Sequence, residues 1–372
     1  MLLLGGLVFL VAVVANSASP TNLTDVGASC TITKFNQVSS VLNSCTNVVV
    51  KNLVVDAGQT LKLFLKAGAT LTFEGTTTFA YREWKGPLIW IKGNGITVIG
   101  AQGHKLDGRG EKWWDGKGDG GKVKPQFMFI QATGGSVLKN INMYNCPHQC
   151  VGISDSDHVT ISNWQLDSSA GNPVNGKEVG HNTDGFDLYK SNYILLDGVV
   201  VRNQDDCICI NGGSHLTFRN LWCYGGHGLS ISSGMSMTDY NLNVVSDVHF
   251  EHCHVSDSRN GIHIKTIADG GKGKMSGLYF SDIQLSGIST YGINVEQNYR
   301  NNGGPSGKPN NNVPIDTLEI NGVTGTLNGP WSVKAYILCA SGACKNFKWS
   351  NINLQGNSRP DSCNFHPSGY NC

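Results

Sequence analysis

The stretch Ile194-Leu195-Leu196-Asp197-Gly198 is followed further along the chain by Leu216-Thr217-Phe218-Arg219-Asn220, which has the same pattern. In both, apolar residues occupy the first and third positions and a turn former ends the segment. Apolar residues with a period of two predict a short half-buried strand, and the closing Gly or Asn predicts a bend. The pattern returns at residues 96–100, 159–163, 248–252, 278–282, 318–322 and 347–351.

This recurrence organises the whole chain. The closest spacings, from Ile194 to Leu216 and from Val248 to Leu278, suit one coil of a stacked structure with loops of variable length. Helical periodicity is rare, although a short helix near Lys34–Leu42 is expected to cover an open end of the stack. The sequence predicts an all-β protein, a right-handed parallel β-helix forming a single-stranded solenoid of about ten coils. A β-sandwich or propeller is the alternative, because the pattern does not reveal strand direction.

Composition limits the classes of function. The chain has 372 residues with 47 Gly, and only 15% are charged, against about 25% in typical proteins. This excludes a coiled coil and a charged disordered tail. Lys plus Arg (28) nearly equals Asp plus Glu (27), so no basic field is present to bind nucleic acid. A charged ligand must therefore be bound by a local group.

The N-terminus reads as an export signal. Residues 2–15 form an uncharged apolar run followed by small residues and Pro20, which predicts a signal peptide over 1–18 and one β-helix domain over 19–372. A membrane anchor is the alternative, but the run is shorter than the ~20 residues that a span needs. We expect a secreted, extracellular monomer without a membrane partner, glycosylated at Asn22 in Asn22-Leu23-Thr24.

Twelve cysteines fit an exported chain, because disulfides persist in oxidising compartments. Some lie close in sequence and could close short loops: Cys30 and Cys45, Cys207 and Cys223, Cys339 and Cys344, Cys363 and Cys372. Sequence alone does not fix the pairing, and no partner is assigned to Cys146, Cys150, Cys209 and Cys253. Zinc binding is an alternative for the clusters Cys207-x-Cys209 and Cys146-x3-Cys150, but neither cluster shows the usual spacing to a second pair.

Acidic residues recur at coil-length intervals. Asp184, Asp205 and His227 follow one another at nearly the interval that separates Ile194 from Leu216, so Asp184, Asp205 or Asp206, and His227 should stack on one face. Crowded carboxylates repel one another, so at least one should have a raised pKa and keep its proton. A protonated carboxyl beside ionised ones suits glycoside hydrolysis. The alternatives are hydrated turn residues or calcium ligands, and on a regular strand Asp205 and Asp206 would point to opposite sides.

Other residues near these carboxylates suggest a ligand. Gly226 and Gly228 flank His227 and are expected to let a bulky ligand approach the backbone. Lys265 supplies a cation suited to an anionic sugar, although a solvated surface lysine is the alternative. Tyr291 is a candidate to stack on a sugar ring, and a core tyrosine is its alternative.

These segments resemble a known family. Asn182-Thr183-Asp184, Gln204-Asp205-Asp206-Cys207, Gly226-His227-Gly228 and Tyr291-Gly292-Ile293 are similar, in order and near spacing, to motifs of the polygalacturonases of glycoside hydrolase family 28. The likeness runs from about Cys30 to Cys372, and the four close cysteine pairs match the family's disulfides. The resemblance implies a right-handed parallel β-helix that hydrolyses α-1,4 bonds in polygalacturonic acid, the pectin backbone. It implies inversion at the anomeric carbon and no metal cofactor.

The resemblance also implies roles for individual residues. Asp205 would be the general acid, and Asp184 and Asp206 would hold and deprotonate the attacking water. His227 would tune the acid or position the leaving sugar. The substrate-binding set would include Asn182, Gly228, His263, Lys265 and Tyr291, with Lys265 on a galacturonate carboxylate and Tyr291 on the ring beside the cut.

One position departs from the family. Where the family has arginine, isoleucine and lysine, this chain has His263-Ile264-Lys265. Arginine binds a carboxylate bidentately at any pH, whereas a histidine offers one charged hydrogen bond, and only when protonated. The intact acidic residues favour a secreted endo-polygalacturonase, slower or more acid-dependent than usual. The alternatives are a hydrolase of another pectic polymer, an exo-acting relative, or a catalytically silent protein that binds pectin.

Overall fold

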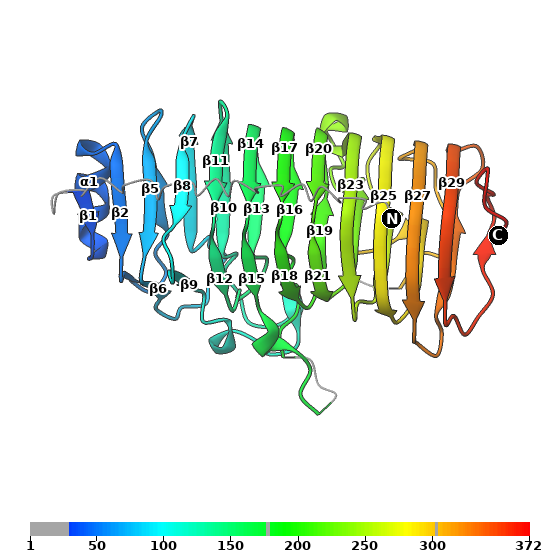
Figure 1. Cartoon of the computed structure of the whole chain (residues 1–372), viewed down its shortest axis with the longest axis horizontal. Coiled ribbons are helices and arrows are strands. Elements are labelled where there is room, and N and C mark those ends of the chain that lie inside the picture. Colours follow the sequence, from blue (N-terminus) through cyan, green and yellow to red (C-terminus); the bar gives the residue numbers. More distant parts are fainter. Residues whose placement is uncertain (1–29, 176–178, 302–303) are drawn as a thin grey trace, which may run out of the picture.

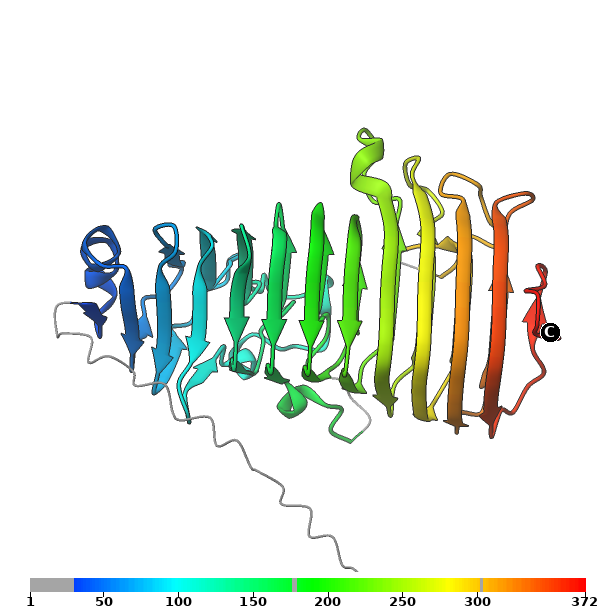
Figure 2. The ribbon, with the colours of Figure 1, turned by 45° about the horizontal axis from the view of Figure 1, so that its top comes forward.

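The chain winds into a right-handed parallel β-helix, as the repeat predicts (Figures 1 and 2). The structure, a computed structural model, describes residues 30–175, 179–301 and 304–372. Neighbouring strands are parallel, with each strand paired to its equivalent in the next coil. The expected signal peptide and the glycosylation site at Asn22 fall in residues 1–29 and lie outside the described residues.

Two long sheets form the walls of the solenoid. Within the described residues the smaller sheet has 11 strands, one per coil, and its outer face carries the acidic residues singled out above. Its strands are β4 (Leu61–Phe64), β7 (Ile89–Asn94), β10 (Met128–Thr133), β13 (Val151–Ser154), β16 (Phe186–Tyr189), β19 (Asp206–Ile210), β22 (Gly228–Ser233), β24 (Asn260–Ile267), β26 (Tyr291–Tyr299), β28 (Val333–Leu338) and β30 (Ser362–Cys363).

The larger sheet has 19 strands in the described part of the chain. In early coils two short strands make up its width, and in the last coils one long strand does so. Its strands are β1 (Thr31–Ile32), β2 (Asn47–Lys51), β3 (Val54–Val55), β5 (Thr70–Glu74), β6 (Thr76–Phe79), β8 (Thr97–Gly100), β9 (Lys105–Asp107), β11 (Ser136–Lys139), β12 (Asn142–Tyr144), β14 (Asp157–Ser162), β15 (Gln165–Asp167), β17 (Ser191–Asp197), β18 (Val200–Asn203), β20 (Gly213–Arg219), β21 (Trp222–Gly225), β23 (Val244–Ser256), β25 (Lys274–Ile288), β27 (Ile315–Leu327) and β29 (Cys344–Gln355).

The closing residue of the repeat makes the bend. A left-handed backbone occurs at this position in seven of the eight quoted segments, the exception being Gly100. The φ angles are 56° at Asn163, 66° at Gly198, 54° at Asn220, 52° at His252, 53° at Asp282, 81° at Gly322 and 55° at Asn351. Gly, Asn and Asp tolerate this region better than other residues, which explains why the pattern ends in them.

The apolar residues of the repeat stack in one buried column. The register places Leu196 beside Phe218, then Phe250, then Phe280, then Ile320, and all are buried. The ring centroids of Phe218 and Phe250 are 4.7 Å apart and those of Phe250 and Phe280 are 4.9 Å apart, both stacked. Burying a Phe side chain stabilises the fold by roughly 1.5–3 kcal/mol, so this column is a major part of the core.

A short helix covers the N-terminal end, close to where the sequence predicts one. Helix α1 (Val38–Ser44) follows a 3₁₀ turn at Phe35–Gln37 and buries Val38, Val41 and Leu42 over the first coils. Other 3₁₀ turns lie at Gly110–Lys112, Gly118–Gly120, Ser169–Gly171 and Tyr240–Asn243. Across the described ranges, no helix combines the length and apolar character needed to cross a membrane.

The structure contains five disulfides. Four join the close pairs, Cys30–Cys45, Cys207–Cys223, Cys339–Cys344 and Cys363–Cys372, and the fifth is Cys146–Cys150. Because Cys146, Cys150 and Cys207 are disulfide-bonded, the zinc alternative for their clusters is wrong. Cys209 and Cys253 are free and buried, so the even number of cysteines does not mean complete pairing.

Candidate active site

A cleft lies on the outer face of the 11-stranded sheet. Alternation along β16 and β19 sends Phe186, Leu188, Ile208 and Ile210 into the core and Asp187 and Cys209 outward. The cleft is lined by the candidate catalytic and binding side chains from successive coils: Asn182, Asp184, Asp205, Asp206, His227, His263, Lys265 and Tyr291. The coil-length spacing therefore predicts correctly that Asp184, Asp205 and His227 come together.

Asp205 lies in a bend just before β19, and Asp206 is the first residue of that strand, so the alternation of a regular strand does not apply between them. A bulge follows within the strand. Asp206 pairs with Gly228 and Ile208 with Leu229, so Cys207 is an extra residue in β19. Cys207 is buried and bonded to Cys223. A bulge re-aims side chains that would alternate on a regular strand. The objection that two neighbouring aspartates must point to opposite sides does not hold here, because Asp205 precedes the strand.

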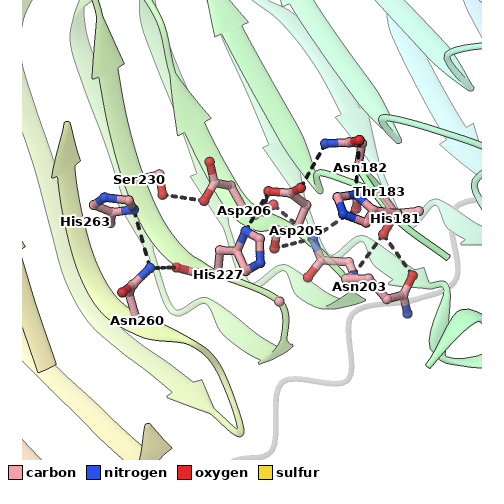
Figure 3. Close-up of polar contacts among 12 residues, drawn as sticks. His181, Asn182, Thr183, Asn203, Asp205, Asp206, His227, Ser230, Asn260 and His263 are labelled. Carbon is pink, nitrogen blue, oxygen red and sulfur yellow. Dashed lines mark hydrogen bonds and ion pairs between the residues drawn. The ribbon is translucent and has the colours of Figure 1, made fainter. Parts of the chain in front are cut away.

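The carboxylate of Asp205 accepts three hydrogen bonds from residues that the structure describes (Figure 3). His227 Nδ1 lies 2.9 Å from Asp205 Oδ1, which also accepts the backbone N–H of Asp206 at 2.8 Å, and Asn182 Nδ2 donates to Oδ2 at 3.1 Å. Burial opposes ionisation of Asp205, but His227 outweighs it and holds the pKa of this carboxyl well below its usual range. Burial also opposes charge on His227, but Asp205 raises the pKa of the imidazole. The two groups therefore act as one coupled pair.

Asp206 is bound to the buried lysine. Lys265 Nζ donates to Asp206 Oδ2 at 2.8 Å, and Ser230 Oγ donates to Oδ1 at 2.5 Å. The side chains of Lys265 and Asp206 are 8% and 2% exposed. Burial opposes charge on Lys265, yet Asp206 outweighs it and raises the pKa of the lysine well above its ordinary value. Lys265 is thus neither a solvated surface lysine nor an unpaired cation.

Two further carboxyls in the cleft favour the protonated form. Burial first, and then the charge of Asp205, raises the pKa of Asp184 well above its usual value. Burial, and then Asp206, does the same for Asp187. The raised pKa values agree with the expectation that at least one crowded carboxyl keeps its proton. The sequence reasoning missed Asp187, although its place between the core residues Phe186 and Leu188 marks it as facing outward.

Replacing Asp187 by Asn should stabilise the protein at neutral pH. Asp187 Oδ2 is buried without a hydrogen-bond partner. Its pKa is raised on folding, so the folded state loses stability as pH rises from the ordinary Asp range through this raised value. Asp187→Asn removes that ionisation, and we expect a gain of about 1 kcal/mol or more in the free energy of unfolding at neutral pH. Urea unfolding should show the gain shrinking in acid; an equal gain at all pH values would contradict this account.

His263 is buried in its own polar contacts. Its side chain is 8% exposed, its Nε2 lies 2.7 Å from Glu296 Oε1, and Asn260 Nδ2 lies 3.4 Å from Nδ1. Burial lowers the pKa of His263 despite the hydrogen bond to Glu296. A neutral ring that donates from Nε2 and accepts at Nδ1 satisfies this network. The sequence reasoning did not single out Glu296, because nothing in its segment shows which residue it faces.

The glycines beside His227 are required by the packing of neighbouring coils. A Cβ at Gly226 would lie 2.1 Å from the carbonyl oxygen of Asp205, and one at Gly228 would lie 2.1 Å from that of Asn260. Their φ angles are +65° and +91°. Neighbouring coils therefore require glycine at both positions, and the approach of a ligand to this backbone stays a prediction.

Within the described part of the chain, two groups of Asp, Cys and His side chains lie close enough together to suit a metal. Ligand atoms of Asp184, Asp206 and Cys209 lie within 4.8 Å of one another, as do those of Asp205, Asp206 and His227. Both groups include Asp206, whose Oδ2 already binds the Lys265 ammonium at 2.8 Å. That ammonium supplies the positive charge that a cation would bring, so we assign no metal to the cleft.

Comparisons with known proteins agree with this geometry. The family described as glycosyl hydrolases family 28 matches residues 45–372. A polygalacturonase of Phaedon cochleariae is 49% identical over 362 residues, 96% of this chain and 97% of that protein. Endopolygalacturonase B of Emericella nidulans is 44% identical, with 96% and 95% covered. The structure of endopolygalacturonase I from Stereum purpureum complexed with two galacturonate has a TM-score of 0.79 at 31% identity, covering 92% of this chain and 100% of that one. The chain belongs to glycosyl hydrolase family 28.

Proposed function

We infer that this chain is a secreted endo-polygalacturonase, which hydrolyses α-1,4 bonds in polygalacturonic acid with inversion. The observation that carries the inference is the joining of Asp184, Asp205, Asp206 and His227 in one cleft. Relatives named polygalacturonase and endopolygalacturonase support the substrate and the endo action. The galacturonate in the Stereum purpureum structure supports a uronic acid as the ligand.

The coupled pair of Asp205 and His227 supplies the acid. A polyanionic substrate brings negative charge and excludes water, and both effects raise the pKa of a carboxyl. With substrate bound, the imidazolium proton passes from His227 Nδ1 to Asp205 Oδ1 along their 2.9 Å hydrogen bond. Asp205 then protonates the glycosidic oxygen as the C–O bond breaks. His227 is thereby a proton reservoir for the acid.

Asp206 is the base in this scheme. Asp184 has a strongly raised pKa, so it suits holding the water by a hydrogen bond better than removing its proton. Asp206, ion-paired with Lys265, takes the proton of the water as the water oxygen bonds to the anomeric carbon. The leaving sugar takes one proton from the pair of Asp205 and His227, and Asp206 takes one from water. After the products leave, Asp206 gives its proton to solvent and His227 takes one up, which restores the cleft.

Activity should fall as pH rises through the raised pKa of His227. Above that pKa the coupled pair has lost its proton and Asp205 has no source to refill it. We expect the basic limb of the kcat/KM profile to lie above the ordinary histidine value of about 6.5. His227→Gln should lower kcat/KM by about 10²-fold or more and change the position of this limb. An unchanged basic limb in the variant would assign it to another group.

An assay of reducing ends tests the function directly. The purified chain should release them from polygalacturonate, and product sizing should show a mixture of short oligomers. Release of monomer alone would mean exo action. Binding of the polymer without any product, from acidic to neutral pH, would overturn the proposal and favour a silent pectin-binding protein.

The silent alternative has a specific observation in its favour. The buried basic side chains Lys265 and His263 of the cleft already face acids, Lys265 at Asp206 and His263 at Glu296. Neither is open to a galacturonate carboxylate in this arrangement. The same observation changes what a restored arginine would do.

An arginine at position 263 should need the removal of Glu296 to bind substrate. His263→Arg alone would place the guanidinium beside Glu296, which would bind it. In His263→Arg with Glu296→Gln, the arginine is available to a substrate carboxylate, a contact worth ~1.5–3 kcal/mol. We expect kcat/KM on the unesterified polymer to rise about tenfold or more over Glu296→Gln alone, with little rise on a highly methyl-esterified polymer. An equal rise on both polymers would contradict the carboxylate contact.

A further inference from the structure

A row of side chains extends the cleft toward the N-terminal coils. The register of the 11-stranded sheet aligns Lys62 with Trp90, Phe129, Gly152 and then Asp187. All five positions therefore lie in one outward-facing line across β4, β7, β10, β13 and β16. Trp90 is three coils from Asp187, about 14 Å at ~4.8 Å per coil.

Aromatic rings occupy the far end of this line. The ring centroids of Phe64 and Trp90 are 5.1 Å apart and those of Trp90 and Phe129 are 5.8 Å apart, both edge-to-face. Phe64 is 43% exposed, and Ile89 and Ile91, on either side of Trp90 in the sequence, are fully buried. Since neighbours along a strand point to opposite faces, the rings lie on the solvent side of the sheet. Trp90 Nε1 donates to Gln131 Oε1 at 3.1 Å, which fixes the orientation of the indole.

Lysines accompany the rings. Lys62 lies beside Trp90 and Lys92 beside Phe64 in the register, and both lysines are exposed. Among the residues that the structure describes, neither lysine forms an ion pair with a carboxylate, in contrast to Lys265 at Asp206. We call Phe64, Trp90, Phe129, Lys62 and Lys92 the distal platform.

This combination matches one class of ligand. The C–H face of a pyranose packs on an aromatic ring, whether the sugar is neutral or charged. A uronate also carries a carboxylate, which an ammonium group binds. The line is continuous with the catalytic carboxylates, so a chain lying along it would reach both. We propose that the distal platform binds uronate residues of the same polymer that is cut beside Asp205, several sugars away from the cut. This inference rests on the proposed function, since that function supplies the polymer.

Binding measured without turnover tests the platform. In an Asp205→Asn background, a galacturonate trimer and an oligomer of about ten sugars, long enough to span ~14 Å from the cleft, are titrated by calorimetry. Adding Trp90→Ala, or Lys62→Gln with Lys92→Gln, should weaken binding of the long oligomer about tenfold and should reduce its advantage over the trimer. Trp222→Ala, a 42% exposed tryptophan stacked on His254 in the other sheet, and Lys139→Gln in β11 are the matched controls and should change neither affinity.

The outcomes separate the platform from the proposed function. Unchanged affinity of the long oligomer in the lysine variant and in Trp90→Ala would overturn the platform. If Trp90→Ala lowers stability, the rings serve as cross-strand packing. The affinity of the variant with Lys62→Gln and Lys92→Gln then shows whether uronates bind there. If the wild-type chain releases no reducing ends but these variants still lose affinity for the long oligomer, the hydrolase is wrong and the platform stands.

Discussion

Asp205→Asn should lower kcat on polygalacturonate by about 10²–10⁴-fold, the share that a positioned general acid supplies. Asn has the shape of Asp, and its Oδ1 can still accept from His227 Nδ1 and from the backbone N–H of Asp206, which lie 2.9 and 2.8 Å from that oxygen. The variant cannot carry a proton to the glycosidic oxygen. We therefore expect an intact fold, near-normal substrate binding and a loss confined to kcat.

A second substrate distinguishes an acid from a residue that only shapes the cleft. A galacturonide with a nitrophenolate leaving group needs little protonation, so Asp205→Asn should lose far less activity on it than on the polymer. Asp197→Asn is a matched control, because Asp197 pairs with Arg219 on the larger sheet, away from the cleft. Equal losses on both substrates would contradict the acid role of Asp205, and so would retained activity on the polymer.

The fold was predictable because each coil repeats the same local chemistry. Alternating apolar residues and a left-handed bend are both visible in the sequence. The coil at residues 136–140 escaped the pattern, because Ser136 stands beside Val159 where an apolar residue is expected. Its hydroxyl donates to Thr133 O at 2.6 Å and accepts from Ile96 N at 3.1 Å. A buried serine can fill an apolar position when such local hydrogen bonds satisfy it.

The site was predictable where spacing equals one coil. Asp184, Asp205 and His227 follow this rule, and each has a side chain that can carry acid or base chemistry. The contacts of Lys265 and His263 were not predictable, because variable loops precede their coil. The bulge at Cys207 also sets side-chain directions that a regular strand would not give. Pairing in a buried site depends on distances of a few ångströms, which sequence spacing does not resolve.

Lys265→Met should lower the free energy of unfolding at neutral pH by about 3–5 kcal/mol, because removing one partner of a buried ion pair leaves the other charge uncompensated. Lys265 has a raised pKa in the fold, so its contribution is complete below the ordinary lysine value of about 10.4 and is lost only as pH rises through the raised value. Urea unfolding at neutral pH therefore measures the whole effect. The cost should lessen in acid, where a buried unpaired carboxylate takes up a proton.

The double variant Asp206→Asn with Lys265→Met shows whether the pair is the cause. The amide oxygen introduced by Asp206→Asn could still accept from Ser230 Oγ, which lies 2.5 Å from Asp206 Oδ1, and no charge would then stay buried without a partner. We expect the double variant to recover most of the stability lost in Lys265→Met, with a coupling energy of about 2 kcal/mol or more. Coupling near zero would mean that the ammonium stabilises the cleft through another contact. The ring of Tyr299 is a candidate, since its centroid lies 4.8 Å from Nζ. Activity separates the two explanations further, because only the ion pair keeps Asp206 ready to take the proton of the water. Tyr299→Leu, which removes the ring beside the ammonium, should leave kcat close to that of the wild type, while Lys265→Met should lose most of it.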